Sequence, residues 1–283
     1  MSWKEEFITC FENSTVDDSL FDKALAIKAE NMPKLLYQYQ PNRENRRQSL
    51  ANNRIWLGSP EHFNDPYDCL FTFNDSLVRA AAHERLAKKF NGVDEQMLAA
   101  VLSKSSSLVS SALSTIRGWR EELCKVSCFS ENPRSLLMWG HYADNHRGFC
   151  VEYDLHRTDA EQMRKKMYPV IYCDKPYDLT PWGISLVNGS KIFNPQWPTL
   201  ALIFKFKDWE YEREWRALEV SQEKIDDHGW TVPAPVRVFL GSKMAAADKQ
   251  QFRAICDPLG VEVLEMHRAE GSFELFEAPL DND

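Results

Sequence analysis

The spacing of apolar positions predicts a chain in which helices and strands are intermingled. Apolar residues recur at helical spacing from Glu12 to Glu30, with Asp17 and Asp18 as caps, and Pro33 closes that segment. Short runs rich in aromatic and β-branched residues predict strands at 34–40, 54–58, 124–129, 148–154, 167–172, 212–220, 236–240, 261–266 and 273–276. Further helices are expected at 41–52, 135–142, 200–207 and 243–256, the last of them capped by Ser242.

Residues 74–123 have a different composition from the rest of the chain. They are rich in Ala, Leu, Ser and Lys and contain few strand formers, which predicts two or three helices interrupted near Asn91 and Gly92. The Pro- and Trp-rich stretch 174–198 is expected to be irregular. Because no regular strand–helix–strand period holds, the pattern predicts a single α+β domain over residues 1–283. That domain is expected to have a mixed or split sheet and a helical insertion at 74–123.

Composition narrows the classes of function. The chain has 283 residues, of which 43% are apolar and 27% charged, as is typical of a globular protein. Its 34 Lys and Arg residues against 42 Asp and Glu give a net charge of −8, which disfavours a broad electrostatic grip on duplex nucleic acid. None of the 11 glycines has the spacing of a dinucleotide or phosphate loop, and the seven cysteines lack metal-site spacing.

The distribution of apolar residues also bears on location. No stretch approaches 18 uncharged apolar residues, and the first seven residues lack the basic-then-apolar order of a signal peptide. We therefore expect a cytoplasmic protein with no membrane partner.

The segment 209–216 is the most unusual in composition. It reads Trp-Glu-Tyr-Glu-Arg-Glu-Trp-Arg, so Glu210, Glu212 and Glu214 share one face if the segment is a strand. An exposed strand edge with Glu–Arg pairs explains this pattern, and so does a cleft, because large aromatics are interleaved with the charges. A carboxylate beside aromatics stabilises a developing cation on a sugar ring, as cleavage of a glycosidic bond requires.

Two other segments combine polar and aromatic residues. Residues 63–68, Phe-Asn-Asp-Pro-Tyr-Asp, fit a turn in which Asn64 and Asp65 bond their own backbone, and they fit equally a site loop. In residues 137–148, Trp139 and Tyr142 lie three apart on one helical face, which is typical of a core contact. His141 and His146 have no partner ligands nearby in the sequence, so no metal site is expected.

In their order along the chain, these segments resemble the bacterial family called domain of unknown function 2971. The resemblance extends over roughly Leu35 to Met266. It is carried by the segments Leu36–Tyr39, Ser59–Asp68, Cys128–Ser130, Leu137–Tyr142, Arg147–Tyr153 and Tyr211–Arg216. The family identifies the kind of chain but implies no activity.

A more distant resemblance implies a chemistry. ADP-ribosyltransferases have a split mixed sheet and use an aromatic or His on a first strand, a hydroxyl residue closing a second, and a Glu-x-Glu opening a later one. Tyr37 or Tyr39, Ser59, and Glu212-x-Glu214 occur here in that order. The resemblance implies an enzyme that takes NAD as substrate, cleaves its nicotinamide–ribose bond, and transfers ADP-ribose to a macromolecule or to water, without a metal.

The same resemblance implies roles for individual residues. Glu214 is expected to stabilise the oxocarbenium charge and Glu212 to orient or deprotonate the acceptor. Tyr37 or Tyr39 would stack on the nicotinamide, while Arg216, or else Arg54, would bind the pyrophosphate. We expect the candidate residues to converge on one cleft, lined by Tyr37 or Tyr39, Ser59, Asn64 or Asp65, and Glu212 or Glu214.

Two other classes of function remain open at this point. A non-catalytic sensor module of a bacterial defence or stress system, including phage defence, would use the same cleft to bind a nucleotide or a protein. A hydrolase or nuclease would hold a divalent ion with Asp65, Asp68 and the Glu cluster. For the transferase, a toxin-like role and a protein or nucleic-acid acceptor are both compatible with the sequence.

The sequence also predicts a core. We expect one set of large side chains from apolar runs to be mostly buried together, namely Trp56, Trp139, Phe149, Tyr153, Ile203, Phe239 and Val263.

Overall fold

A mixed β-sheet organises the fold. The computed structural model describes residues 1–14, 17–89, 118, 122–188, 196–221 and 223–280. Within these residues the main sheet has eight strands in the order β14-β13-β12-β5-β1-β4-β10-β6, all neighbours being antiparallel except β12 and β13. Their bounds are β1 Leu35–Gln40, β4 Cys124–Ser130, β5 Phe149–Asp154, β6 Met167–Pro169, β10 Glu214–Val220, β12 Arg237–Leu240, β13 Glu262–Arg268 and β14 Leu275–Pro279.

Three short two-stranded ladders flank the main sheet. β2 (Arg54–Leu57) pairs with β11 (His228–Thr231), β3 (Phe71–Thr72) with β8 (Tyr177–Asp178), and β7 (Ile171–Cys173) with β9 (Phe204–Phe206). A single bridge between Gly58 and Val126 joins the end of β2 to β4.

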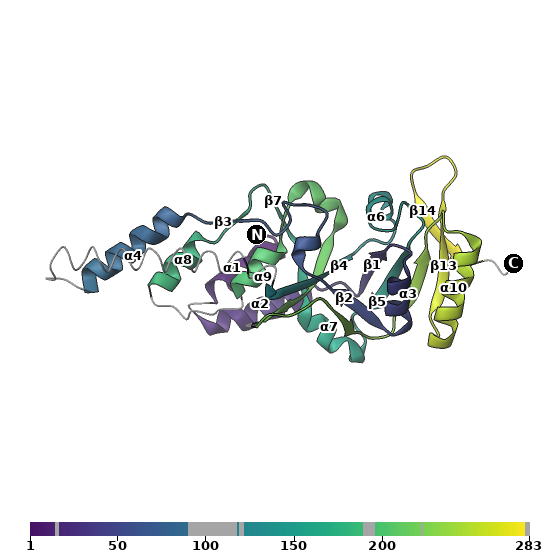
Figure 1. Ribbon diagram of the computed structural model, residues 1–283, viewed down its shortest axis with the longest axis horizontal. Helices are drawn as coiled ribbons and strands as arrows, with labels where there is room; N and C mark the ends of the chain where they lie inside the picture. The colour runs from purple at the N-terminus through teal and green to yellow at the C-terminus, as the bar shows by residue number, and fades with distance from the viewer. Residues whose placement is uncertain (15–16, 90–117, 119–121, 189–195, 222, 281–283) are drawn as a thin grey trace.

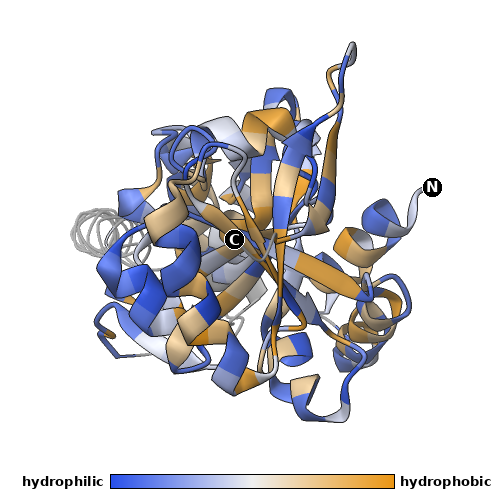
Figure 2. Ribbon diagram, turned by 90° about the vertical axis from the view of Figure 1, so that its right-hand side faces the viewer, coloured by the Kyte–Doolittle hydropathy of each residue, from blue (hydrophilic) through white to orange (hydrophobic). Residues whose placement is uncertain are grey.

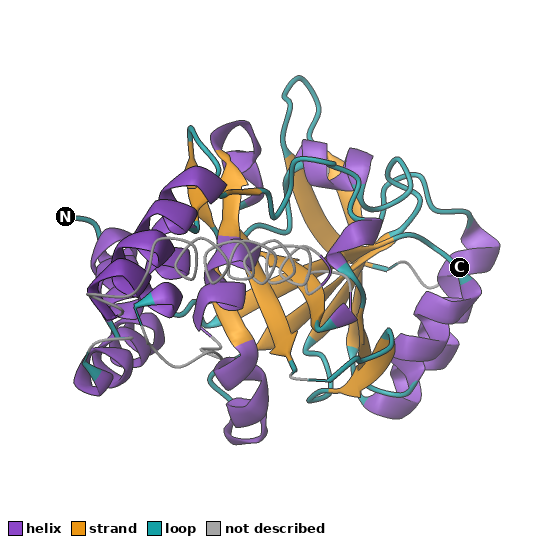
Figure 3. Cartoon of the chain, turned by 60° about the vertical axis from the view of Figure 1, so that its left-hand side comes forward, coloured by secondary structure: helices purple, strands orange, loops and turns teal. Residues whose placement is uncertain are grey.

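The helices gather at both sides of the strands (Figure 3). The α-helices are α1 Trp3–Asn13, α2 Asp18–Glu30, α3 Glu44–Ala51, α4 Asp75–Lys89, α6 Leu136–His141, α7 Glu161–Lys166, α8 Thr180–Val187, α9 Gln196–Ile203 and α10 Ala246–Cys256. The 3-10 helices are η1 Pro60–His62, η2 Thr158–Ala160, η3 Lys207–Glu212 and η4 Asp257–Leu259. Asp17 caps α2 as predicted, whereas α10 begins after Ala245 and not at Ser242.

The pleat of the central strands separates two faces of the sheet. One face carries Leu36, Phe129 and Trp215 and packs against α3, α7 and α10, where Phe252 is fully buried. In Figure 2 the strands inside the molecule are largely orange, while the helices around them also present blue segments outward. This face is therefore an ordinary apolar core.

The opposite face is divided. At one end, Phe7 and Phe11 of α1 pack with α2 and α9 on Val126 and Leu218. At the other end, α6 places Trp139 over β1, β5 and β12. Between these two apolar clusters, the same face of β4 and β10 carries polar side chains instead, and this gap positions the candidate site described below.

The predicted fold class is confirmed at the level of an α+β fold with a mixed, multi-stranded sheet. Three element predictions are corrected. The stretch 174–198, predicted to be irregular, contains β8 and α8. The helix expected at 200–207 ends at Ile203, where the chain enters β9 and pairs with β7. The strand expected from Glu212 begins at Glu214, because η3 turns the chain before it.

The predicted helical insertion is described only in part. α4 is helical as expected and packs on α8, and together they project to the left in Figure 1. Most of the predicted insertion, 90–117 and 119–121, lies outside the described residues. Across the part of the chain that is described, no helix combines the length and the apolar character needed to cross a bilayer.

The burial predicted for most of these side chains is confirmed, since Trp139, Phe149, Tyr153, Ile203 and Phe239 are buried and Val263 is half-buried. The prediction that they share one core is wrong, because the sheet separates them into three clusters. Trp56 was predicted wrongly, since its side chain is 42% exposed. β2 alternates between exposed and buried positions, and the face that enters the core carries Ile55 and Leu57.

This contrast provides a test of the packing. Trp139 is fully buried, and its indole N–H donates to the Pro133 carbonyl at 2.8 Å. We expect Trp139→Ala to lower the free energy of unfolding by about 3–5 kcal/mol, as large-to-small core changes do. Trp56→Ala is the matched control and should cost less than about 1 kcal/mol. Urea unfolding of both variants measures this; equal losses would contradict the assignment of Trp139 to the core.

Candidate functional site

Five charged side chains are buried together where the two apolar clusters leave their gap. They are Asp68, Lys205, Glu212, Glu214 and Arg216, each no more than 6% exposed. We call this group the ionic cluster. Charged residues are almost never fully buried unless they are paired, so the pairing within the cluster decides whether the fold is stable.

Arg216 lies at the base of the cluster on β10. Its Nε and Nη2 donate to the two oxygens of Glu214 at 2.7 and 3.0 Å, and Nη2 also reaches both oxygens of Asp68 at 2.9 and 2.7 Å. Nη1 donates to the Leu202 carbonyl at 2.6 Å. All three guanidinium nitrogens are therefore engaged inside the protein, and a ligand has no access to them.

Lys205 is the second cation of the cluster. Its Nζ lies 2.5 Å from Glu212 Oε2, 2.9 Å from Glu214 Oε2 and 3.4 Å from Asp68 Oδ2. The ammonium thus occupies the point at which three carboxylates converge. It reaches this point because β9 pairs with β7 and presents the middle residue of Phe-Lys-Phe inward.

A residue with an unusual backbone conformation lies between the two glutamates that contact the same cation. Arg213, between Glu212 and Glu214, has φ = 45°, in the left-handed region that non-glycine residues rarely adopt. The residue ends η3 and starts β10, and the Glu214 N–H then donates to the Tyr172 hydroxyl at 2.8 Å. Glu212 and Glu214 consequently meet Lys205 from two different elements, which simple strand alternation did not predict.

The charges of the cluster do not balance. Three carboxylates face two cations, so one negative charge lacks a full partner when all are ionised. Burial would raise the pKa of Glu214, but the charges of Arg216 and Lys205 outweigh burial and lower it. Burial and the nearby charge of Glu214 raise the pKa of Glu212 above its ordinary value. The pKa values of the two glutamates are therefore shifted in opposite directions.

A cavity of about 560 Å³ opens beside the cluster, a size in the range of small-molecule sites. We call it the first cavity. It is lined by two kinds of side chain, aromatic and polar. The lining residues are Tyr37, Tyr39, Pro41, Arg43, His62, Phe63, Asn64, Asp68, Cys128, Phe129, Ser130, Met138, Gly140, His141, Tyr142, Asp144, Asn145, Lys205, Glu212 and Glu214.

Tyr142 links the cavity wall to the cluster. The side chain of Ser135 caps α6, and Tyr142 follows the last residue of that helix. Its hydroxyl donates to Glu212 Oε1 at 2.6 Å and accepts from the Asn64 side-chain amide at 3.4 Å. Burial, together with the charge of Glu212, raises the pKa of Tyr142, so the phenol stays protonated. Glu212 is thus held on one oxygen by Tyr142 and on the other by Lys205.

Strained backbone is concentrated around this site. Six non-glycine residues among those described have positive φ, and five of them, all except Asn53, lie in segments beside the cavity or the cluster. They are Cys69, which follows Asp68, the consecutive residues Asp144, Asn145 and His146, and Arg213. Each such residue costs on the order of 1–3 kcal/mol, and strain of this kind is characteristic of functional sites.

Several of the predicted site residues converge as expected. Tyr37 and Tyr39 on β1, Asn64 in the loop after η1, Glu212 at the end of η3 and Glu214 at the start of β10 all line the first cavity. The strand order β1-β4-β10 explains this, because one strand separates the two tyrosines from the two glutamates. Asp65 lines a second cavity, and Lys205 lines both this cavity and the first one.

Two predicted site residues do not have the positions or contacts that were expected. Ser59 is absent from the residues that line the first cavity, and its N–H donates to Asp227, which pairs with Lys125. Ser59 follows Gly58, which bridges Val126 at the edge of β4, so it is held away from the first cavity. Arg216 faces the site but is fully buried and saturated by Glu214 and Asp68, so the predicted pyrophosphate contact is wrong.

The hydrolase alternative would need Asp65, Asp68 and the glutamates to share a divalent ion. The Asp65 carboxylate accepts from the Tyr67 N–H and lines the second cavity, whereas both oxygens of Asp68 bind Arg216. Where carboxylates do converge, the Lys205 ammonium holds the central position. Among the described residues, no group of three His, Cys, Asp or Glu side chains is arranged to hold a metal.

Sequence reasoning missed three residues of this site. Lys205 was assigned to a helix, although a lysine between Phe204 and Phe206 indicates a cation carried into an apolar layer. Tyr142 was read as core, and no local signal pairs it with Glu212. Arg43 lines the cavity from the start of α3, while Arg54 lies exposed on β2.

Comparison with known proteins gives one match. Residues 138–217 match the family model described as Protein of unknown function (DUF2971). This segment is shorter than the Leu35 to Met266 range expected from the sequence. It contains Tyr142 and every member of the ionic cluster except Asp68. No curated protein matches the chain, and no solved structure matches it either.

The coupling inside the cluster can be measured with a double-mutant cycle. Lys205→Met leaves three buried carboxylates with one cation and should cost about 3–5 kcal/mol of unfolding free energy. Adding Glu212→Gln removes one of the two carboxylate charges left without a cation and should recover part of that loss. Lys207→Met is the control, because Lys207 is an exposed lysine paired with Asp174 and should cost less than about 1 kcal/mol. If the losses in unfolding free energy of Lys205→Met and Glu212→Gln simply added in the double variant, the coupling within the cluster would be contradicted.

The opposed pKa shifts predict a specific dependence of stability on pH. The raised pKa of Glu212 means that its charge destabilises the folded state at neutral pH, and this cost is relieved as pH falls through the raised pKa toward about 4.3. The lowered pKa of Glu214 contributes stability above about 4.3, which is lost as pH falls further. As pH is lowered in steps, urea unfolding should first show the unfolding free energy of wild type rising relative to that of Glu212→Gln. At lower pH it should then fall relative to that of Glu214→Gln. Parallel curves for all three proteins would contradict the assignment.

Proposed function

We propose that the protein is an ADP-ribosyltransferase-like enzyme that cleaves the nicotinamide–ribose bond of NAD and passes ADP-ribose to an acceptor. The observation that supports this most is Glu212, a buried carboxylate with a raised pKa, held by Tyr142 and Lys205 at the wall of an aromatic, nucleotide-sized cavity. A carboxylate whose pKa is raised toward neutrality suits general-base chemistry at physiological pH.

The proposed reaction assigns the two glutamates different roles from those expected from the sequence. The bond between C1′ of the ribose and the nicotinamide nitrogen breaks, and its electron pair stays on that nitrogen and neutralises the pyridinium ring. Glu212 stabilises the cation that develops on the ribose. An acceptor lone pair then forms the new bond to C1′, and the acceptor proton passes to Glu212. Glu214 acts as a positioning residue, because its charge is already neutralised by Arg216 and Lys205.

Other groups on the wall suit the rest of such a substrate. Tyr37, Tyr39 and Phe63 supply aromatic rings in the first cavity for the planar parts of the dinucleotide. With Arg216 and Lys205 occupied, Arg43, His62 and His141 are the basic residues of the lining that remain for the pyrophosphate. Ser59, the serine of the transferase pattern, does not line this cavity, and its N–H donates to Asp227 instead.

A non-catalytic nucleotide-binding module is the second candidate. It is favoured by one observation, that both oxygens of Glu212 are already hydrogen-bonded within the protein. For such a module, NAD would raise the melting temperature without being consumed. Incubation of the purified protein with NAD, with and without cell lysate, followed by chromatography of released nicotinamide, separates the two functions.

Substitution of Glu212 tests the proposed chemistry. Glu212→Gln keeps the shape but removes the charge, and we expect nicotinamide release to fall by roughly 10²–10³ for the loss of one preorganised group. Glu210→Gln, at an exposed position of η3, is the matched control and should be unchanged. Glu214→Gln should lose activity together with a lower melting temperature, because it opens the ionic cluster. An active Glu212→Gln enzyme would overturn the proposal.

A further inference from the structure

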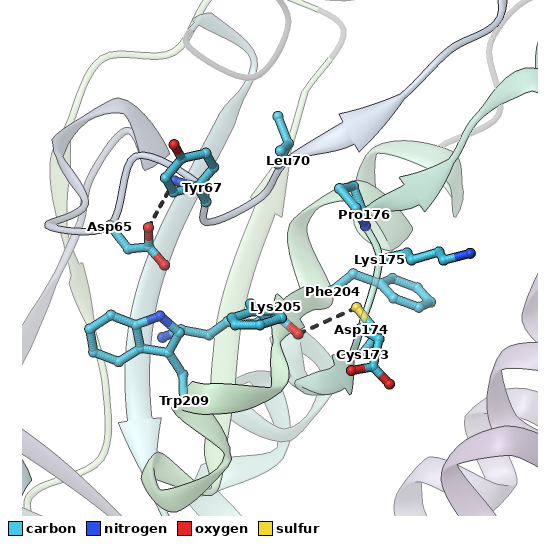
Figure 4. Close-up of a pocket in the computed structure, with 11 residues that line it drawn as sticks. Asp65, Tyr67, Leu70, Cys173, Asp174, Lys175, Pro176, Phe204, Lys205 and Trp209 are labelled. Carbon is cyan, nitrogen blue, oxygen red and sulfur yellow. Dashed lines mark hydrogen bonds between the residues drawn. The ribbon is translucent and has the colours of Figure 1, made fainter.

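A second cavity lies on the other side of Lys205 (Figure 4). Its volume is about 390 Å³, and most of its lining is apolar. Figure 4 shows Asp65 and Tyr67 across from Trp209, with Leu70 and Pro176 nearby. The full lining is Asp65, Tyr67, Leu70, Cys173, Asp174, Lys175, Pro176, Phe204, Lys205, Phe206 and Trp209.

The rim of the second cavity is unusually apolar for a protein surface. Nine large apolar side chains are exposed among the described residues, and three of them, Tyr67, Leu70 and Phe206, line this one cavity at 69%, 38% and 43% exposure. Single exposed apolar residues need no explanation, but their gathering around a hollow marks an interaction site.

The second cavity is connected to the candidate active site. Lys205 lines both cavities, and its ammonium binds Glu212. The Trp209 ring lies 5.2 Å from that ammonium and 6.4 Å from the ring of His141, which lines the first cavity. A group seated in the second cavity therefore sits beside the residues that hold Glu212.

The polar groups of the second cavity indicate what it binds. Asp65 accepts from the Tyr67 N–H, the Cys173 thiol donates to the Lys205 carbonyl, and Asp174 pairs with Lys207. Each of these groups already has a partner within the protein, and the mostly aromatic and apolar lining supplies the main attraction for a ligand. The lining carries two carboxylates, Asp65 and Asp174, against Lys175 and the cluster-bound Lys205, so it lacks the positive excess that a nucleic-acid backbone requires.

We propose that the second cavity is an acceptor subsite that takes an aromatic or large apolar side chain of a polypeptide. Apolar pockets that take an aromatic side chain are typical anchor sites at the centre of protein interfaces. As an acceptor subsite it rests on the proposed function, and it assigns the acceptor to the class of proteins. As a peptide-binding site it stands on the apolar rim and on the contact with Lys205.

Saturation-transfer NMR with two blocked tripeptides tests the proposal. Ac-Gly-Trp-Gly-NH2 should receive saturation from the protein, and Ac-Gly-Ala-Gly-NH2 should not. Tyr67→Ser and Phe206→Ser should each lower the affinity for the tryptophan peptide by roughly tenfold, a typical effect for an anchor contact. Phe273→Ser is the matched control, because Phe273 is 94% exposed in the loop between β13 and β14, and it should bind as wild type. Circular dichroism confirms that each variant is folded.

The outcomes separate this inference from the proposed function. Equal binding of both tripeptides would overturn it, as would tryptophan-peptide binding that survives both rim substitutions. Binding of an eight-residue thymidine oligonucleotide that competes with the tryptophan peptide would also overturn it. Glu212→Gln should bind the tryptophan peptide as wild type. If wild type never consumes NAD yet binds that peptide at the rim, the proposed function fails while the peptide site stands.

Discussion

The ionic cluster is the interaction on which the rest of the structure depends. Two cations and three carboxylates are buried on one face of the sheet, and removal of either cation would leave charge uncompensated in a low-dielectric interior. The cluster joins the loop that carries Asp68, the short strand β9 and the start of β10. The loop with Asp68 is far in the sequence from the other two segments, so the cluster connects distant parts of the chain beside both cavities.

The imbalance of charge within the cluster links stability to chemistry. Glu214 is kept ionised by two cations, while Glu212 shares only Lys205 and a tyrosine hydroxyl. Two carboxylates in one site thus acquire different proton affinities, which is the usual way in which a protein separates a structural from a reactive group. The left-handed Arg213 makes this division possible by bringing both side chains to one ammonium.

Much of the fold could be predicted from the sequence, because strands such as β1, β4 and β5 have a clear local pattern. The convergence of Tyr37 and Tyr39 with Glu212 was also predicted, because the resemblance to the transferase pattern implied a shared cleft. The contacts between side chains that are distant in the sequence could not be predicted. Arg216 looked available to a ligand because the sequence does not show Asp68 facing it, and Lys205 was misplaced because its inward orientation depends on pairing between β9 and β7.

The central claim is that the cluster drives the proton affinities of Glu212 and Glu214 apart. Carbon-13 NMR of protein labelled at the glutamate carboxyl carbons measures it directly, with Glu212→Gln and Glu214→Gln spectra to assign the two signals. The account predicts that the Glu212 signal titrates above the ordinary range near pH 4.3 and the Glu214 signal below it. Two carboxylates titrating together near pH 4.3 would contradict it.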